Sequence, residues 1–184
     1  MMTPLQFFPK LETERLLLRP LTMNDLDFVF RHFSEPLVTE FLLDEAPISD
    51  IAQAREMIES YQESETKSWN RWGIVLKNNH QIIGTCGYHK WNKRDLRAEI
   101  GYDLGPEFWG KGIMTEALRA ALQNGLEGMG LNRIEAMVHP QNQGSLHLLH
   151  KLGFQKEGLL RDYHHSNGSF HSHYILSLLK RDWK

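Results

Sequence analysis

The chain has 184 residues, of which 41% are hydrophobic and 24% charged, an ordinary composition for one globular domain with a sizeable core. Its 21 Lys and Arg residues against 23 Asp and Glu residues give a net charge of −2, which excludes the overall basic footprint of a nucleic-acid-binding protein. The single cysteine, Cys86, excludes an internal disulfide, and no apolar run is long enough to span a bilayer. Residues 1–4 show no signal-peptide pattern, so we expect a cytoplasmic protein whose one domain spans residues 1–184.

The first third of the chain predicts one strand and two helices. Residues 14–21, with three consecutive leucines, have the composition of a strand. Asn24 is a predicted cap of the first helix, which Pro36 should end because a proline ring cannot continue a helix. Ser49 is the predicted cap of the second helix. Residues 37–47 have no clean period and predict a loop, where we expect part of the substrate choice to lie.

The remaining elements predict an antiparallel meander followed by helices and strands in alternation. In chain order they are strands at 72–76, 82–88 and 98–104, a helix at 112–127, a strand at 133–139, a helix capped by Asn142 and running to Lys151, and two strands joined by a turn at Asn167-Gly168. The order β-α-α-β-β-β-α-β-α-β-β predicts an α/β (α+β) fold in which helices cover both faces of a mixed sheet.

A glycine-rich turn before the longest predicted helix is the most informative local motif. Gly110 and Gly112 bracket Lys111, and an amphipathic helix follows at once. The amides of a first helical turn have no partner inside the helix and carry the positive end of its dipole, so this turn predicts a phosphate-binding site. A plain strand-to-helix turn would also use glycine, which leaves that alternative open at the level of spacing.

Histidines around the Asn167-Gly168 turn raise the possibility of a metal site. If the turn has a two-residue loop, His164 faces His171, and His173 shares that face opposite Asp162. A longer loop would shift the register and disperse the cluster. We favour lining of a substrate pocket or a plain polar face, and expect no metal. Cys86 is expected to be a small buried residue rather than a nucleophile.

Three segments taken together resemble a known superfamily. They are residues 98–104, 108–116 and 142–154, and the opening residues 11–19 and the stretch 90–104 add to the likeness. The set resembles the GNAT superfamily of acetyl-CoA-dependent N-acetyltransferases, most closely the RimJ/RimL-type branch that acetylates ribosomal proteins. The resemblance implies a mostly antiparallel sheet that splays between the fourth and fifth predicted strands, with helices on both faces.

The resemblance also implies where coenzyme A binds. The family loop Gln/Arg-x-x-Gly-x-Gly/Ala holds the diphosphate on backbone amides, the preceding strand pairs with the pantetheine arm, and an asparagine holds that arm. Trp109 and Met114 depart from the loop pattern, although amides rather than side chains do the binding. The positions so implied are Tyr102, Asp103, Leu104, Gly110, Lys111, Gly112, Ile113, Met114, Thr115, Asn142 and Lys151.

Acetyl transfer in this family is a direct attack of the amine on the thioester, which needs a base and a donor for the departing thiolate. Glu99 is the candidate base, since alternation places it on the same face as Gly101 and Asp103. The alternative for Glu99 is a solvated carboxylate paired with Arg97 or Arg94, and Glu135 is the rival base. Ser145 stands where this branch has a serine near the sulfur, with a plain first-turn residue as its alternative.

We therefore expect an acetyl-CoA-dependent N-acetyltransferase that acts on a primary amine, with a protein N-terminus as one expected acceptor. A small-molecule amine, such as a polyamine or an antibiotic, and a catalytically silent coenzyme A-binding module remain the alternatives. A dinucleotide-binding oxidoreductase is disfavoured because the loop lacks a third glycine and follows antiparallel strands. The apolar residues 176–179 could seal the core or a dimer seam, and we expect a monomer or homodimer without nucleic-acid or membrane partners.

Overall fold

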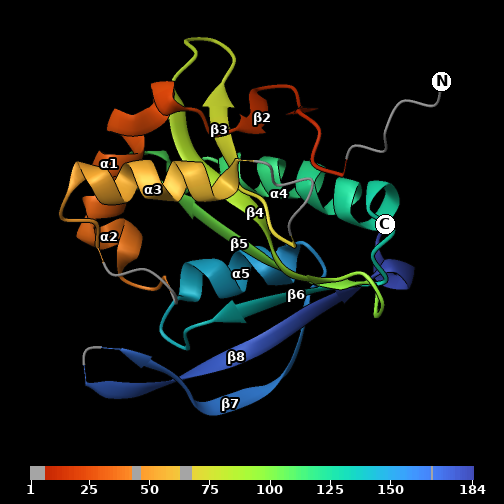
Figure 1. Cartoon of the computed structure of the whole chain (residues 1–184). Helices are drawn as coiled ribbons and strands as arrows, with labels where there is room; N and C mark the ends of the chain where they lie inside the picture. Colours follow the sequence, from red (N-terminus) through yellow and green to blue (C-terminus); the bar gives the residue numbers. More distant parts are fainter. Residues whose placement is uncertain (1–6, 43–46, 63–67, 167) are drawn as a thin grey trace.

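The computed structural model describes residues 7–42, 47–62, 68–166 and 168–184, and its centre is one eight-stranded sheet (Figure 1). The strands lie in the order β1-β2-β3-β4-β5-β6-β8-β7. Their bounds are β1 Leu11–Glu12, β2 Leu16–Pro20, β3 Trp72–Leu76, β4 Ile82–Asn92, β5 Arg97–Leu104, β6 Arg133–Val138, β7 Gln155–Ser166 and β8 Ser169–Leu179. Neighbouring strands run antiparallel, except that β5 and β6 are parallel. This is the mixed, mostly antiparallel sheet expected from the sequence.

Helices cover both faces of the sheet, with α3 and α4 on opposite sides (Figure 1). They are α1 Leu26–Ser34, α2 Pro36–Thr39, α3 Ile51–Tyr61, α4 Ile113–Gln123 and α5 Gln143–Lys151. One core cluster joins α1 and α3 through side chains such as Val29, Phe33 and Ile58. The larger cluster joins α4 and α5 to the other face of the sheet. Within the described residues, no helix is long and apolar enough to cross a membrane.

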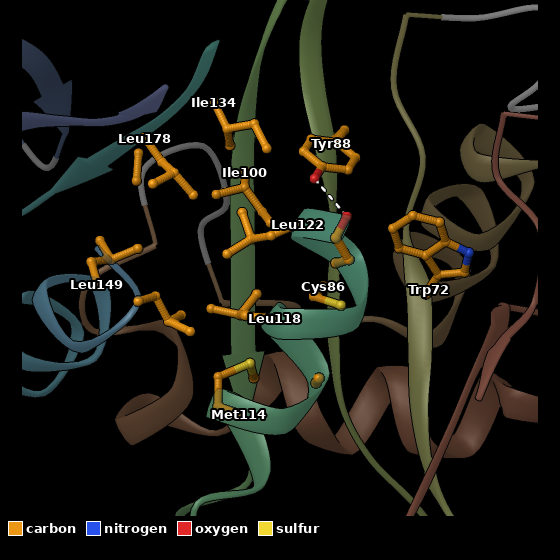
Figure 2. Close-up of a cluster of buried hydrophobic side chains, with 14 of the residues drawn as sticks. Trp72, Cys86, Tyr88, Ile100, Met114, Leu118, Leu122, Ile134, Leu149 and Leu178 are labelled. Atoms are coloured by element: carbon orange, nitrogen blue, oxygen red, sulfur yellow. Dashed lines mark hydrogen bonds between the residues drawn. The ribbon is translucent and has the colours of Figure 1, made fainter. Parts of the chain in front are cut away.

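Helix α4 is the centre of the larger cluster, where Leu118 and Leu122 pack against the sheet (Figure 2). At its carboxyl end the chain changes to a π-helical turn, Asn124–Gly128. The Tyr88 hydroxyl donates a 2.8 Å hydrogen bond to the Ala121 carbonyl just before this turn (Figure 2). A side chain on Gly125 would collide with the same hydroxyl, so a glycine is required there.

The sheet splays where β5 and β6 diverge, as the resemblance implied. The two strands pair only from Arg97–Arg133 to Glu99–Glu135. Beyond Glu99, β5 keeps its antiparallel partner β4 but, among the described strands, has none on the β6 side. The separation leaves an open strand edge toward the middle of the molecule.

The amino-terminal third differs from its sequence prediction in its helices. Residues 37–47 were predicted to be a loop, yet they contain most of the short helix α2. As predicted, α1 ends just before Pro36: its last residue is Ser34, and Glu35 has an extended backbone. Pro36 then occupies the first turn of α2, where its fixed φ is favourable and its missing N–H needs no partner. The Glu35 side chain caps α2 by accepting from Leu37 N–H at 3.3 Å. Residues 43–46 of this segment lie outside the described residues.

Two predicted caps are each displaced by one or two residues. Asn24 is not the first cap, because Met23–Asp25 form a 3-10 turn that begins after Thr22. Ser49 is not the cap of the second predicted helix, because the Asp50 carboxylate caps that helix by accepting from Ala52 N–H at 2.9 Å. Ser, Asp and Asn are all good caps, so composition alone could not choose between adjacent residues.

Candidate active site

A cavity of about 1040 Å³ lies at the splay. Its walls come from β5, the end of β6, the start of α4, and helices α2 and α5. It brings together most of the predicted site residues, namely Glu99, Tyr102, Asp103, Leu104, Gly110, Gly112, Ile113, Met114, Thr115, Asn142, Ser145 and Lys151. Lys111 is the predicted residue that does not line it; its ammonium lies 5.7 Å from the centre of the Phe108 ring.

The glycine-rich turn has the backbone that an anion site requires. Gly110 and Gly112 both have φ of +72°, a left-handed conformation that favours glycine. Gly112 is the N-cap of α4, and within the described structure no side chain caps this helix end. The first-turn amides of residues 113–115 are therefore left for a ligand in the cavity. The turn fits the diphosphate of a coenzyme.

A carboxylate in the first turn of α4 is neutralised by the amino-terminal segment. Glu116 accepts from Arg15 Nε at 2.6 Å, from Arg15 backbone N–H at 2.9 Å and from Thr13 Oγ1 at 2.5 Å. Burial opposes ionisation, but these donors hold the pKa of the Glu116 carboxyl below its ordinary value. Arg15 Nη1 also donates to the Lys111 carbonyl at 3.2 Å, which braces the turn. The opening motif of the chain thus supports the distant glycine-rich turn.

Trp109, where the family loop has Gln or Arg, has a structural contact of its own. Its indole N–H donates to the Leu104 carbonyl at 2.8 Å, which ties the turn to the last residue of β5. The residue is 51% exposed and borders the cavity.

Asp103 is buried on the sheet, and its side chain is fully engaged. The carboxylate accepts from His32 Nε2 at 2.6 Å, from Arg71 Nη1 at 2.9 Å, and from the Thr85 hydroxyl and amide at 2.5 and 3.0 Å. Burial raises its pKa, but the bond and charge of His32, with Arg71 and Thr85, hold it below the ordinary value. Its side chain joins α1, the segment just before β3, and β4 to β5, which leaves only its main chain for a coenzyme.

The two candidate bases have different surroundings. Glu99 lines the cavity, and its carboxylate accepts from Lys90 Nζ at 3.0 Å. The alternative, a carboxylate paired with Arg97 or Arg94, differs from the contact seen, since the partner of Glu99 is Lys90 and Arg97 reaches Glu135 at 3.4 Å. Glu135 also accepts from Arg133 Nε at 2.7 Å and is not among the described residues that line the cavity. The geometry therefore favours Glu99.

Ser145 lies in the first turn of α5, opposite β5. Its backbone N–H donates to Asn142 Oδ1 at 3.0 Å, so Asn142 is the helix cap that the sequence predicted. The Ser145 hydroxyl lies 2.6 Å from the Tyr102 hydroxyl. Burial raises the pKa of Tyr102 well above its ordinary value. The sequence had assigned Tyr102 to coenzyme binding through its backbone and gave no role to its hydroxyl.

Three further residues that line the cavity were not predicted from the sequence: Tyr61, Arg71 and His89. His89 pairs with Glu99 across the strands, and its Nε2 lies 3.2 Å from where a Gly101 side chain would begin. Burial, with the nearby charges of Arg71 and Lys90, lowers the pKa of His89 to about 3, so its ring is neutral at physiological pH. Strand alternation from Tyr88, which faces the core, could have placed His89 toward the cavity.

The histidines of the β7–β8 hairpin only partly follow the prediction. His164 pairs with His171, as a two-residue turn requires, although Asn167 itself lies outside the described residues. A bulge between Leu160 and His164 then places His173 opposite Leu160, so the predicted pairing with Asp162 is wrong. Among the described residues, no group of three or more His, Cys, Asp or Glu side chains is arranged to hold a metal ion. Cys86 is buried in the core, as predicted.

A splayed sheet, an anion-binding helix end and an open strand edge around one cavity define a transferase that binds an acyl-coenzyme A. Comparison with known proteins agrees: the profile of the acetyltransferase (GNAT) domain matches residues 15–155. The chain belongs to the GNAT family of N-acetyltransferases, which use acetyl-CoA.

The chain is 43% identical over 174 residues to the uncharacterized N-acetyltransferase p20 of Bacillus licheniformis, covering 94% of this chain and 97% of that protein. It is 34% identical over 113 residues to the ribosomal protein uS5 alanine N-acetyltransferase of Escherichia coli, covering 61% and 58%. A spermidine N-acetyltransferase from Vibrio cholerae, solved in complex with CoA and spermine, has the same fold, with a TM-score of 0.82 at 22% identity over 92% and 98% of the two chains. The likeness to ribosomal-protein acetyltransferases supports the resemblance seen in the motifs.

Proposed function

We propose that this protein transfers an acetyl group from acetyl-CoA directly to a primary amine, and that the acceptor is the α-amine of a protein N-terminus. One observation carries the proposal: a single cavity holds the glycine-rich turn, the open edge of β5, and the side chains of Glu99 and Ser145. These are the parts that coenzyme binding, amine deprotonation and thiolate departure need. The relative that acetylates the alanine of a ribosomal protein supports the choice of acceptor.

In this proposal the diphosphate binds the amides at the start of α4, and the pantetheine arm runs along β5 as an added strand. Lys151 lines the same cavity and would add a positive charge toward the coenzyme. The thioester then lies near the splay, between Glu99 on β5 and Ser145 on α5. Glu99 takes a proton from the incoming ammonium, and the Ser145 hydroxyl donates to the departing sulfur.

The charges at the acceptor end favour an α-amine over a polyamine. The acidic side chains among the described lining residues are Glu40, Glu99 and Asp103. Asp103 is paired with Arg71, and Glu99 with Lys90, so most of this negative charge is already compensated. An extended polycation would need more free carboxylates along its length. An α-amine has a pKa of about 8 and needs only modest help to lose its proton.

The acceptor is tested by following thiol release from acetyl-CoA with a panel of amines. We expect peptides that begin with alanine or serine to be acetylated faster than spermidine or a lysine side chain, and N-terminally blocked copies of the same peptides to be inert. Faster turnover of spermidine would contradict the proposed acceptor. Binding of acetyl-CoA without transfer to any amine would indicate a silent coenzyme-binding module.

A further inference from the structure

Two hydroxyl groups from different elements lie within hydrogen-bonding distance of each other in the wall of the cavity. Tyr102 comes from β5 beyond the splay, Ser145 from the first turn of α5, and their oxygens are 2.6 Å apart. Both residues line the cavity. The pantetheine-binding role assigned to this strand uses its main chain and leaves the Tyr102 hydroxyl without a function.

Either hydroxyl could donate in this contact, and the surroundings favour Tyr102 as the donor. The Tyr102 ring packs against the main core cluster, and its burial keeps the phenol protonated. Ser145 is fixed at its backbone by the Asn142 cap. A hydroxyl has one hydrogen and two lone pairs, so a serine that accepts from Tyr102 keeps its own hydrogen for a third group. That hydrogen is then available to the cavity.

We propose that Tyr102 is a positioning residue that donates a hydrogen bond to Ser145 and thereby holds the serine hydrogen toward the sulfur of the departing coenzyme. The inference rests on the proposed function and deepens it. As the amine nitrogen bonds to the carbonyl carbon, the carbon–sulfur bond breaks and its electron pair stays on sulfur. Ser145 stabilises this thiolate by a hydrogen bond, and both hydroxyl protons stay on their oxygens. The ammonium first gives one proton to Glu99, which passes it to water, and Glu99 then takes the second proton that the nitrogen loses as the amide forms. Water later protonates the thiolate.

A double-mutant cycle tests the coupling with the best acceptor of the amine panel. We expect Tyr102→Phe to lower kcat about tenfold, the order expected when one neutral hydrogen bond is lost, and to change the KM for acetyl-CoA less than twofold. Ser145→Ala should lower kcat at least as much. The double variant should be no slower than Ser145→Ala, because Tyr102 acts only through the serine.

Tyr88→Phe is the matched control. It also removes a buried tyrosine hydroxyl that makes one hydrogen bond, to Ala121, but Tyr88 is not among the described residues that line the cavity. We expect it to lower thermal stability and leave kcat unchanged.

A second measurement needs no acceptor. In protein labelled with 13C at the tyrosine ζ carbon, the Tyr102 signal is assigned by its loss in Tyr102→Phe. It should move on binding CoA and move less on binding desulfo-CoA, which lacks the sulfur atom. In Ser145→Ala the two ligands should shift the signal equally.

The outcomes separate this inference from the function on which it rests. If Ser145→Ala is slow but Tyr102→Phe keeps the parent kcat, the role of Tyr102 alone is overturned. The same holds if the losses of kcat in the two single variants multiply in the double variant. A Tyr88→Phe as slow as Tyr102→Phe also overturns it. Equal shifts with CoA and desulfo-CoA in the parent protein do the same. If Ser145→Ala itself keeps the parent rate, the proposed role of Ser145 fails as well.

Discussion

Glu99 and Asp103 lie on the same face of β5, yet their environments give them opposite tasks. Asp103 is enclosed by His32, Arg71 and Thr85, which stabilise its negative charge permanently. Glu99 is paired with Lys90, whose side chain is 58% exposed, and its neighbour on β6 is another carboxylate, Glu135. A base must release its partner to take up a proton, so only Glu99 suits that role.

Glu99→Gln should lower kcat about 100-fold, because the amide keeps the shape of the side chain but cannot accept the proton. The affinity for acetyl-CoA should stay unchanged, and the rise of rate with pH should flatten. Steady-state kinetics and calorimetry measure the two effects. Glu135→Gln is the matched control, since Glu135 pairs with Glu99 in the sheet but lies among arginines. A slow Glu135→Gln beside a normal Glu99→Gln would exchange their roles.

Asp103→Asn should destabilise the fold by about 3 kcal/mol at pH 7, because it removes a buried carboxylate that pairs with Arg71 and His32. The folded state lowers the pKa of Asp103, so this stabilisation is present above the pKa of the unfolded chain and is lost as pH falls through the folded value. The difference in unfolding free energy between the parent protein and Asp103→Asn should therefore become smaller below about pH 4. Urea denaturation at several pH values measures this difference. A difference that stays constant in acid would contradict the stabilising role of the ionised Asp103 carboxylate.

At the scale of elements, the turn before α4 works because its neighbours hold it. Trp109 ties it to β5, and Arg15 ties it to the amino-terminal segment. The two left-handed glycines let the chain enter the helix without a capping side chain. The result is a helix end whose first-turn amides are already oriented for the anion that we propose binds there.

Gly112→Val should weaken the binding of acetyl-CoA at least tenfold, because a branched side chain in a left-handed conformation distorts the amides of the turn. Gly130→Val is the control: Gly130 has the same φ of +72° but is not among the described residues of the cavity. Both variants should lose similar stability by circular dichroism, whereas only Gly112→Val should lose affinity by calorimetry. Equal affinities in two folded variants would move the diphosphate elsewhere.

The sequence predicted most elements because their signals are local. The helix that became α4 has an amphipathic period, and α5 has a strong cap in Asn142. The sequence did not predict α2, because a helix of four residues is too short to show a period. The π-helical end of α4 was also missed; the Tyr88 hydroxyl, which bonds to Ala121 just before this turn, comes from a strand distant in the sequence.

At the scale of the whole molecule, the site depends on the divergence of two strands. The residues that the family motifs assign to coenzyme binding, apart from Lys111, line one cavity, because they lie in three short segments. His89, Arg71 and the Tyr102–Ser145 contact could not be derived in this way. They come together only through strand pairing and helix packing between separate parts of the chain.

The apolar residues near the carboxyl end seal the core, since Leu176 and Leu178 are buried in the main cluster. They therefore give no support to a dimer seam. We continue to expect a monomer or homodimer, which light scattering measures directly. A larger closed assembly would contradict this expectation.

The hydrogen bond from the Trp109 indole to the Leu104 carbonyl fixes the position of this ring, which has a practical consequence. Trp72 and Trp91 are buried in the core, and Trp69 and Trp183 are not among the described residues that line the cavity, whereas Trp109 is half exposed at its rim. The fluorescence of an indole depends on the polarity and quenchers around it, so a coenzyme that covers this ring changes its emission. The enzyme thus contains its own optical reporter, and Trp109→Phe supplies the blank against which each titration can be read.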